Sequence, residues 1–194
     1  MTPLITNLTS ARLAYGPMTE AHAELAVRWA NDFAVSRTRG MPLRPYAPET
    51  VRGWHERSRT GQDRAWFVIY EQASARPIGE TGFTQLDLFH HTAEFGILIG
   101  ETDCWGQGYG TEATRRMLAY GFTQLRLHSI WLRVSSANER GLRAYQRAGF
   151  REAGRLREAQ WIDDRLCDLI FMDCLAREFE TQEPRIKNQE PVGS

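Results

Sequence analysis

The stretch Trp105-Gly-Gln-Gly-Tyr-Gly-Thr111 decides how this sequence is interpreted, because it places three glycines at alternate positions just before a predicted helix. Glycines leave the backbone N–H groups of a turn uncovered, and the N-terminus of a helix carries a partial positive charge. Such a turn suits a phosphate group. A plain structural turn can have the same composition, so the turn alone leaves both interpretations open.

Two common nucleotide-binding motifs are absent from this turn. The sequence contains no GxxxxGK[ST] stretch, which argues against hydrolysis of nucleoside triphosphates. Gly106, Gly108 and Gly110 give the spacing GxGxG instead of GxGxxG, and the strand before them does not open a βαβ unit. The turn therefore favours an anionic ligand that is bound in another way.

Outside the turn, apolar residues recur with the periods of strands and helices. They predict strands over residues 11–15, 65–70, 78–86, 92–99, 129–134, 151–162 and 165–174, and helices over residues 20–31, 49–59, 111–125 and 138–148. Residues 37–48 contain Gly40 and three prolines, which predicts a loop that either shapes a pocket or simply connects two helices. This order of elements predicts one α/β (α+β) domain over residues 1–178, followed by a polar, disordered tail over residues 179–194.

The composition is that of an ordinary globular protein. Of the 194 residues, 42% are hydrophobic and 25% are charged, which is enough to build a core without disulfides or metals. Lys+Arg and Asp+Glu both number 24, so no net positive charge attracts nucleic acid. We therefore expect no nucleic-acid partner.

The cysteines and the N-terminus bear on the cellular compartment. Cys104, Cys167 and Cys174 form no CxxC pair and have no histidine at metal-ligand spacing, which argues against a disulfide framework and a structural zinc site. The first ten residues lack the features of a signal peptide, and no stretch approaches 18 consecutive apolar residues. We expect a cytoplasmic protein with reduced thiols, no metal and no membrane partner.

Four stretches of the chain together resemble the GNAT superfamily of acetyl-CoA-dependent N-acetyltransferases. They are Glu94-Phe-Gly-Ile-Leu-Ile99, Trp105-Gly-Gln-Gly-Tyr-Gly-Thr-Glu-Ala113, Asn138-Glu-Arg-Gly-Leu-Arg-Ala-Tyr145, and Ala148-Gly-Phe150 with the hairpin that follows. The resemblance covers about residues 10–178 and is greatest to the branch of ribosomal-protein alanine acetyltransferases. It implies a mixed, mostly antiparallel sheet flanked by helices, in which two splayed strands hold acetyl-CoA.

Trp105 departs from the general pattern of the family, which has glutamine or arginine at this position. Tryptophan here is similar to the ribosomal-protein branch. The departure suggests that backbone amides, and no side chain at position 105, hold the pyrophosphate.

The resemblance implies a set of cofactor-binding residues. The backbone of Leu98 and Ile99 would bind the pantetheine arm, as an added strand would, because splayed strands leave unpaired backbone groups. Asn138 would bind the same arm, cap the following helix, or do both. Arg140, Arg143 and Arg147 either reach the adenosine 3′-phosphate or form a solvated helix face. The residues expected at the pyrophosphate are Gln107, Gly108, Tyr109, Gly110 and Thr111.

The chemistry of acetyl transfer points to three candidate catalytic side chains. Tyr145 resembles the general acid of the family, although core packing is its alternative role. A carboxylate is the simplest base for an ammonium substrate, and Glu94 and Glu80 each interrupt an apolar strand; Glu94 is the first candidate. The backbone N–H of Leu98 is the expected donor to the oxyanion.

The predicted activity is transfer of an acetyl group from acetyl-CoA to a primary amine by direct attack. The acceptor is a peptide N-terminus or a small-molecule amine such as a polyamine, an antibiotic or an amino sugar. The alternative is a regulatory module that binds acyl-CoA without catalysis. A homodimer is expected by analogy with the superfamily alone.

Overall fold

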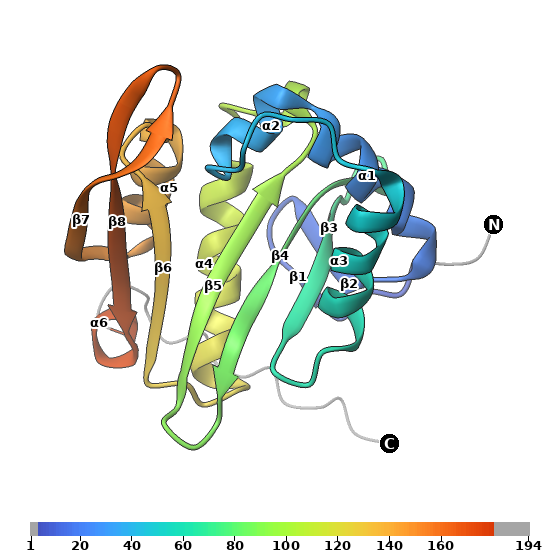
Figure 1. Ribbon diagram of the computed structural model, residues 1–194. Helices are drawn as coiled ribbons and strands as arrows, with labels where there is room; N and C mark the ends of the chain where they lie inside the picture. Colours follow the sequence, from blue (N-terminus) through green and yellow to red (C-terminus); the bar gives the residue numbers. More distant parts are fainter. Residues whose placement is uncertain (1–3, 181–194) are drawn as a thin grey trace.

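An eight-stranded sheet in the order β1-β2-β3-β4-β5-β6-β8-β7 forms the centre of the computed structural model, which describes residues 4–180 (Figure 1). All neighbouring strands are antiparallel except β5 and β6, which are parallel. The predicted mixed, mostly antiparallel sheet is thus confirmed. The strands are β1 (Leu8–Thr9), β2 (Leu13–Pro17), β3 (Ala65–Glu71), β4 (Arg76–Asp87), β5 (Thr92–Ile99), β6 (Ser129–Ser135), β7 (Arg151–Ile162) and β8 (Arg165–Leu175).

Helices cover both faces of this sheet. The helices α1 and α3 lie on one face, and α4 lies on the opposite face with α5 beside it (Figure 1). The helices are α1 (Ala23–Asn31), α2 (Phe33–Thr38), α3 (Pro48–Thr60), α4 (Tyr109–Thr123), α5 (Glu139–Ala148) and α6 (Ala176–Glu180).

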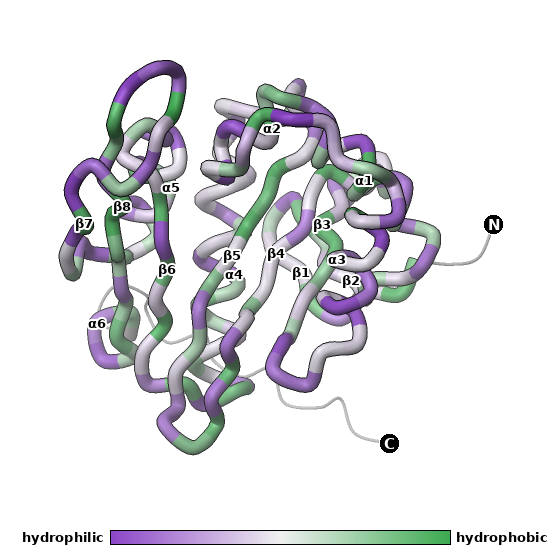
Figure 2. The backbone as a smooth tube through the Cα atoms, viewed as in Figure 1, coloured by the Kyte–Doolittle hydropathy of each residue, from purple (hydrophilic) through white to green (hydrophobic). Residues whose placement is uncertain are grey.

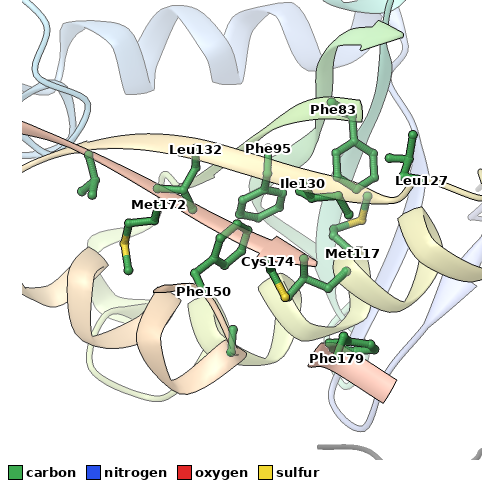
Figure 3. Packing of buried hydrophobic residues seen from close by; sticks show 14 of the residues in the cluster. Phe83, Phe95, Met117, Leu127, Ile130, Leu132, Phe150, Met172, Cys174 and Phe179 are labelled. Carbon is green, nitrogen blue, oxygen red and sulfur yellow. The ribbon is translucent and has the colours of Figure 1, made fainter. Parts of the chain in front are cut away.

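The main hydrophobic core lies between the sheet and α4 (Figure 3). Phe83 of β4 and Phe95 of β5 pack there with Met117 of α4, and all three side chains are almost fully buried. Ile130 of β6 and Met172 of β8 extend the same core toward the far edge of the sheet. Since burial of each large apolar side chain contributes about 1.5–3 kcal/mol, this layer fixes the position of α4 against the sheet.

The strands β5 and β6 separate soon after they begin. Their parallel pairing includes only Thr92–Glu94 and Ser129–Trp131. Beyond Glu94, β5 stays paired with β4 as far as Ile99, whereas β6 follows β8. The two strands diverge toward the top of Figure 1, and the strongly hydrophobic upper part of β5 is visible in Figure 2. The predicted splay is therefore present, and it leaves one edge of β5 without a strand partner.

The ends of the helices around the splay follow signals in the sequence. The Asn138 side chain caps α5 by accepting a hydrogen bond from the N–H of Gly141 at 2.9 Å. At the other end of α5, Gly149 takes a left-handed conformation with φ 118°. In the closing hairpin, Asp163 and Asp164 both have positive φ, as a type I′ turn requires.

Three elements differ from the sequence-based expectation. The helix α2 was not predicted, although Asp32 caps it by accepting hydrogen bonds from the N–H groups of Ala34 and Val35. The strand β1 was not predicted either. The chain also stays ordered past residue 178, because α6 buries Phe179 in the core. The rest of the predicted tail, residues 181–194, lies outside the described residues.

Candidate active site

A cleft of about 770 Å³ opens at the splay between β5 and β6. Its walls come from the strands β3 to β6, the C-terminal end of α2, the glycine-rich loop before α4, and α5. Of the twelve catalytic and cofactor-binding residues proposed from the sequence, only Gln107 does not line this cleft. The fold therefore brings together residues that lie far apart in the chain.

The glycine-rich loop presents uncovered backbone to the cleft. Gly106 and Gly108 have φ values of 76° and 85°, a region that residues with side chains rarely adopt. A Cβ atom added at Gly106 or Gly110 would meet no atom within 4 Å. Gly108 is the N-cap of α4 and offers no side chain to the first N–H groups of the helix. These N–H groups and the positive end of α4 suit a phosphate group.

The side chains of Gln107 and Tyr109 do not take part in this phosphate site. The Gln107 side chain donates a hydrogen bond to the carbonyl oxygen of Asp103 at 2.7 Å. The Tyr109 ring is buried and its hydroxyl donates to Glu71 at 2.7 Å. Their predicted role in binding is thus confined to the backbone of the loop.

Arg12, just before β2, holds the loop in place. Its backbone N–H and Nε donate to the two carboxylate oxygens of Glu112 at 2.7 and 2.8 Å. Its Nη1 donates to the carbonyl oxygen of Gln107 at 3.0 Å, and the guanidinium lies 4.4 Å from the centre of the Tyr109 ring. Because 95 residues separate Arg12 from Gln107, no local pattern in the sequence revealed this contact.

The open edge of β5 presents the backbone of Ile97 and Ile99, and the structure corrects the prediction for Leu98. The N–H of Gly100 donates to Ile78 of β4 at 2.9 Å, so Gly100 faces β4. The backbone N–H and C=O groups of successive residues point alternately to the two neighbouring strands. Those of Leu98 therefore point to β4, as those of Gly100 do. Its carbonyl oxygen indeed lies 2.1 Å from the point where a Cβ atom of Gly79 would stand. Leu98 is thus unable to donate its N–H to an oxyanion at the splay.

Trp105 occupies the end of this open edge. Its indole N–H donates to the carbonyl oxygen of Ile99 at 2.8 Å. The Arg140 guanidinium of α5 stacks on the indole, 3.7 Å from the ring centre. The Ile99 carbonyl is thus already bonded, which leaves its N–H and the backbone of Ile97 for a ligand.

Two predicted contacts on α5 are already engaged within the chain. Besides capping α5, Asn138 donates its Nδ2 to the carbonyl oxygen of Thr38 at 2.9 Å, so both polar atoms of its amide have partners. Arg143 forms an exposed ion pair with Glu139 at 3.2 Å. Each polar atom of the Asn138 amide keeps capacity for one more hydrogen bond, and Arg143 is held only by a weak surface contact.

Tyr145 lines the cleft and packs against two neighbouring aromatic rings. Its ring meets those of Phe95 and Phe150 edge-on, with ring centres 6.3 and 6.1 Å apart. Burial raises the pKa of Tyr145 to about 12. The hydroxyl is therefore protonated at neutral pH and can act as a proton donor. The structure shows the packing that was considered from the sequence, and the role of Tyr145 as a general acid stays a prediction.

The two candidate glutamates differ in their surroundings. Glu94 accepts hydrogen bonds from Arg133 at 2.8 Å and from Gln85 at 2.7 Å. Glu80 forms no ion pair within residues 4–180, and burial raises the pKa of its carboxyl group. The nearby side chains of Arg39, His55 and Trp66 oppose this shift only in part. A buried carboxylate without an ion pair is freer to accept a proton than one held by Arg133 and Gln85, so the geometry favours Glu80 over Glu94.

Two further residues of the cleft were not singled out in the sequence. Arg39 lines the cleft beyond the C-terminal end of α2, and its guanidinium makes no contact with a carboxylate in the described chain. Trp66 of β3 lines the cleft as well. An aromatic residue at the start of a strand is common, so only the tertiary structure reveals this position.

No group of three or more His, Cys, Asp or Glu side chains in residues 4–180 is arranged to hold a metal ion. Cys104 lines the cleft, but burial raises the pKa of its thiol, which keeps it neutral. No helix in this part of the chain is long and apolar enough to cross a membrane.

Comparison with known proteins identifies the family. A model of the acetyltransferase (GNAT) domain matches residues 12–151. The chain belongs to the GNAT acetyltransferase family. This enzyme is therefore an acyltransferase, and the N-acetyltransferase activity predicted from the four sequence stretches is confirmed at the level of the family.

Two curated relatives and one solved structure show how far the similarity extends. The uncharacterized N-acetyltransferase p20 of Bacillus licheniformis is 27% identical over 89% of this chain and 97% of its own length. The spermidine N(1)-acetyltransferase of Vibrio cholerae is 34% identical over 58% of this chain and 64% of its own length. A crystal structure of spermidine N-acetyltransferase from Vibrio cholerae with CoA and spermine covers 88% of this chain and 99% of its own, with a TM-score of 0.79 and 23% identity. This last similarity shows that the fold is shared.

Proposed function

We propose that this enzyme transfers the acetyl group of acetyl-CoA to a primary amine that attacks the thioester directly. The single observation that supports this proposal is the cleft at the splay. A phosphate site at the N-terminus of α4, an open edge of β5 and the side chains of Tyr145 and Glu80 all face this one cavity. A cofactor with a diphosphate, an amide-bearing arm and a thioester matches these three features in that order.

The cofactor would be held mainly by backbone groups. The N–H groups of Gly108, Gly110 and Thr111 would bind the diphosphate, since the loop and the helix N-terminus leave them uncovered. The amides of pantetheine would pair with the edge of β5 at Ile97 and Ile99 as an added strand does. That the CoA-bound structure from Vibrio cholerae has the same fold supports this assignment.

The residues of the chain provide for each proton in the reaction. Glu80 accepts a proton from the acceptor ammonium, which frees the nitrogen lone pair to attack the thioester carbon. The N–H of Ile97 stabilises the negative charge that develops on the carbonyl oxygen. As the new C–N bond forms and the C–S bond breaks, Tyr145 donates its proton to the departing sulfur. The attacking nitrogen then loses its second proton, which restores the Tyr145 hydroxyl, and Glu80 releases its proton to solvent. The products are an N-acetylated amine and CoA.

The acceptor is one of the amines expected from the sequence: a peptide N-terminus, a polyamine, or an amino group of an antibiotic or amino sugar. The spermidine acetyltransferases among the relatives support a polyamine. The assignment to the ribosomal-protein branch, the homodimer and the cytoplasmic location remain predictions. The family membership does not favour the alternative of a non-catalytic acyl-CoA-binding module.

The test is thiol release by the purified protein in the presence of acetyl-CoA and single amines from a panel of these classes. We expect release of CoA only when an acceptor amine is present, with an N-acetylated product of matching amount. Calorimetry with CoA tests binding separately. Binding of CoA without turnover on any amine would favour the regulatory module, and absence of CoA binding would contradict the proposal.

A further inference from the structure

The indole of Trp66 reaches across the neighbouring strands in the part of the cleft that contains Glu80. Trp66 of β3 pairs with Gly82 of β4, which in turn pairs with Gly96 of β5. A Cβ atom at Gly82 would stand 2.9 Å from Cε3 of the indole, and one at Gly96 would stand 2.7 Å from Cη2. The two glycines thus leave the space that lets the benzo edge of the indole reach across β4 to β5.

This arrangement is unusual for central strands. A glycine inside a strand weakens it and often marks a close approach of another group. Here two glycines stand opposite each other in central strands, and the group that approaches both is the same indole. Because Trp66 also lines the cleft, the ring forms part of the floor on which a ligand would rest.

The two glutamates of the cleft flank this ring. Side chains alternate along a strand, so Glu80 and Gly82 share one face of β4, and Glu94 and Gly96 share that face of β5. On this face of the β4–β5 ladder, the pair Glu80–Leu98 is the next pair on one side of Gly82–Gly96. The pair Thr84–Glu94 is the next pair on the other side. An aromatic surface between two carboxylates is a favourable place for an ammonium group.

The charged side chains around Trp66 favour the binding of a single ammonium group. Among the described residues that line the cleft, Glu80 and Glu94 are the only carboxylates. Glu94 is already paired with Arg133 at 2.8 Å, so Glu80 alone remains for an amine. Arg39 lines the same part of the cleft and brings a positive charge close enough to lower the pKa of Glu80. A second ammonium group near the first would therefore meet Arg39 or Arg133 instead of a free carboxylate.

We propose that Trp66 is the floor of the acceptor subsite and that the acceptor is a monoamine with an uncharged stem. Its ammonium group lies toward Glu80, and its stem lies on the face of the indole. This inference rests on the proposed acetyl transfer and adds the class of acceptor. It differs from the polyamines named for the relatives, in which several ammonium groups share one stem.

The class of acceptor is tested with two amines that share a stem. Pentylamine and 1,5-diaminopentane differ by one ammonium group, and kcat/KM is measured for each at saturating acetyl-CoA, together with spermidine. We expect pentylamine to have a kcat/KM at least about tenfold above that of either polyamine, a difference that one unfavourable charge contact can produce. A higher kcat/KM for 1,5-diaminopentane or spermidine would overturn the inference while leaving acetyl transfer intact.

The floor is tested with Trp66→Ala, Trp66→Phe and Gly96→Ala. We expect each to raise the KM for the monoamine by about tenfold or more with little change in the CoA dissociation constant, because Trp66 contacts only the acceptor. Gly96→Ala should act by displacing the ring, since the added Cβ would collide with it. The matched control is Trp161→Ala, because Trp161 is 67% exposed on β7 and does not line the cleft.

The outcomes separate the inference from the proposed function. An unchanged acceptor KM in Trp66→Phe and Gly96→Ala would exclude Trp66 as the floor, even if Trp66→Ala fails to fold. A parallel loss of CoA affinity in these variants would also contradict the assignment, because it would place the ring at the cofactor. Failure of the unmodified enzyme to bind CoA would instead contradict the proposed function.

Discussion

Arg12 donates a hydrogen bond from Nη1 to the carbonyl oxygen of Gln107 at 3.0 Å, and so connects the start of β2 to the loop that we assign to the diphosphate. The same side chain is anchored by Glu112 in the first turn of α4. With these contacts Arg12 fixes the loop relative to the helix. The N–H groups of the loop are then in place before a ligand arrives, which lowers the entropic cost of binding.

The first prediction concerns Arg12→Ala. Loss of its hydrogen bonds should loosen the loop and weaken binding of CoA by about tenfold, which corresponds to about 1.4 kcal/mol. Binding of S-acetylpantetheine, which lacks the diphosphate, should stay unchanged. Calorimetry with both ligands measures the difference, and Arg57→Ala on the exposed surface of α3 is the control. Equal losses for the two ligands would show that Arg12 acts on something other than the diphosphate loop.

The second prediction concerns Gly108→Val. Gly108 has φ 85°, and a branched side chain disfavours this conformation and would crowd the phosphate. We expect the dissociation constant for CoA to increase by at least about tenfold, measured by calorimetry. Gly53→Val is the matched control, because Gly53 of α3 has no neighbour within 4 Å of an added Cβ and lies away from the cleft. Unaltered binding in Gly108→Val would argue against the phosphate site.

The third prediction distinguishes Glu80 from Glu94. Removing a general base typically reduces the rate about 10²- to 10⁴-fold, so Glu80→Gln should lower kcat by this amount and Glu94→Gln by much less. Because burial raises the pKa of Glu80, the group stays protonated and inactive to a higher pH than an ordinary glutamate. The rate should therefore rise as pH increases through this raised pKa, and the Glu80→Gln profile should lack that step. The reverse ranking of the two variants would make Glu94 the base.

The raised pKa of Glu80 also affects the stability of the protein. A carboxyl group whose pKa is raised by folding stabilises the native state below its unfolded pKa, and this contribution is lost as pH rises through the folded pKa. The free energy of unfolding should thus fall more steeply with rising pH in the unmodified protein than in Glu80→Gln. Urea denaturation at a series of pH values measures both slopes, and identical slopes would contradict the buried, ionisable state of Glu80.

The fourth prediction concerns Tyr145→Phe. This change keeps the ring that packs against Phe95 and Phe150 and removes the hydroxyl, so the fold and CoA affinity should remain. The turnover rate should drop about 10²- to 10⁴-fold, because the departing sulfur then lacks its proton donor. Steady-state kinetics together with calorimetry separate the two effects. Turnover equal to that of the unmodified enzyme would remove Tyr145 from the mechanism.

Features encoded by neighbouring residues could be predicted from the sequence. The glycine turn before α4, the cap at Asn138 and the left-handed Gly149 each depend on a few consecutive residues. The helix α2 was missed because it has only six residues and is followed by prolines, although Asp32 gave a capping signal. Phe179 was assigned to the tail because its short segment is otherwise polar.

Features set by register and tertiary contacts could not be predicted in this way. The pattern of β5 alone does not show which edge is open. The hydrogen bond from the Gly100 N–H to Ile78 shows that the backbone groups of Leu98 point to β4. Glu80 and Glu94 have the same strand pattern, and they differ because Arg133 arrives from another strand. The contact of Arg12 with the glycine-rich loop and the position of Trp66 beside Gly82 and Gly96 likewise depend on partners that are distant in the chain.

The most direct test of the account is a crystal structure of the protein with bound CoA. We expect the diphosphate oxygens within hydrogen-bonding distance of the backbone N–H groups of Gly108, Gly110 and Thr111, and the pantetheine amides paired with Ile97 and Ile99 on the open edge of β5. A complex in which the loop before α4 stays empty and CoA binds elsewhere would contradict the account.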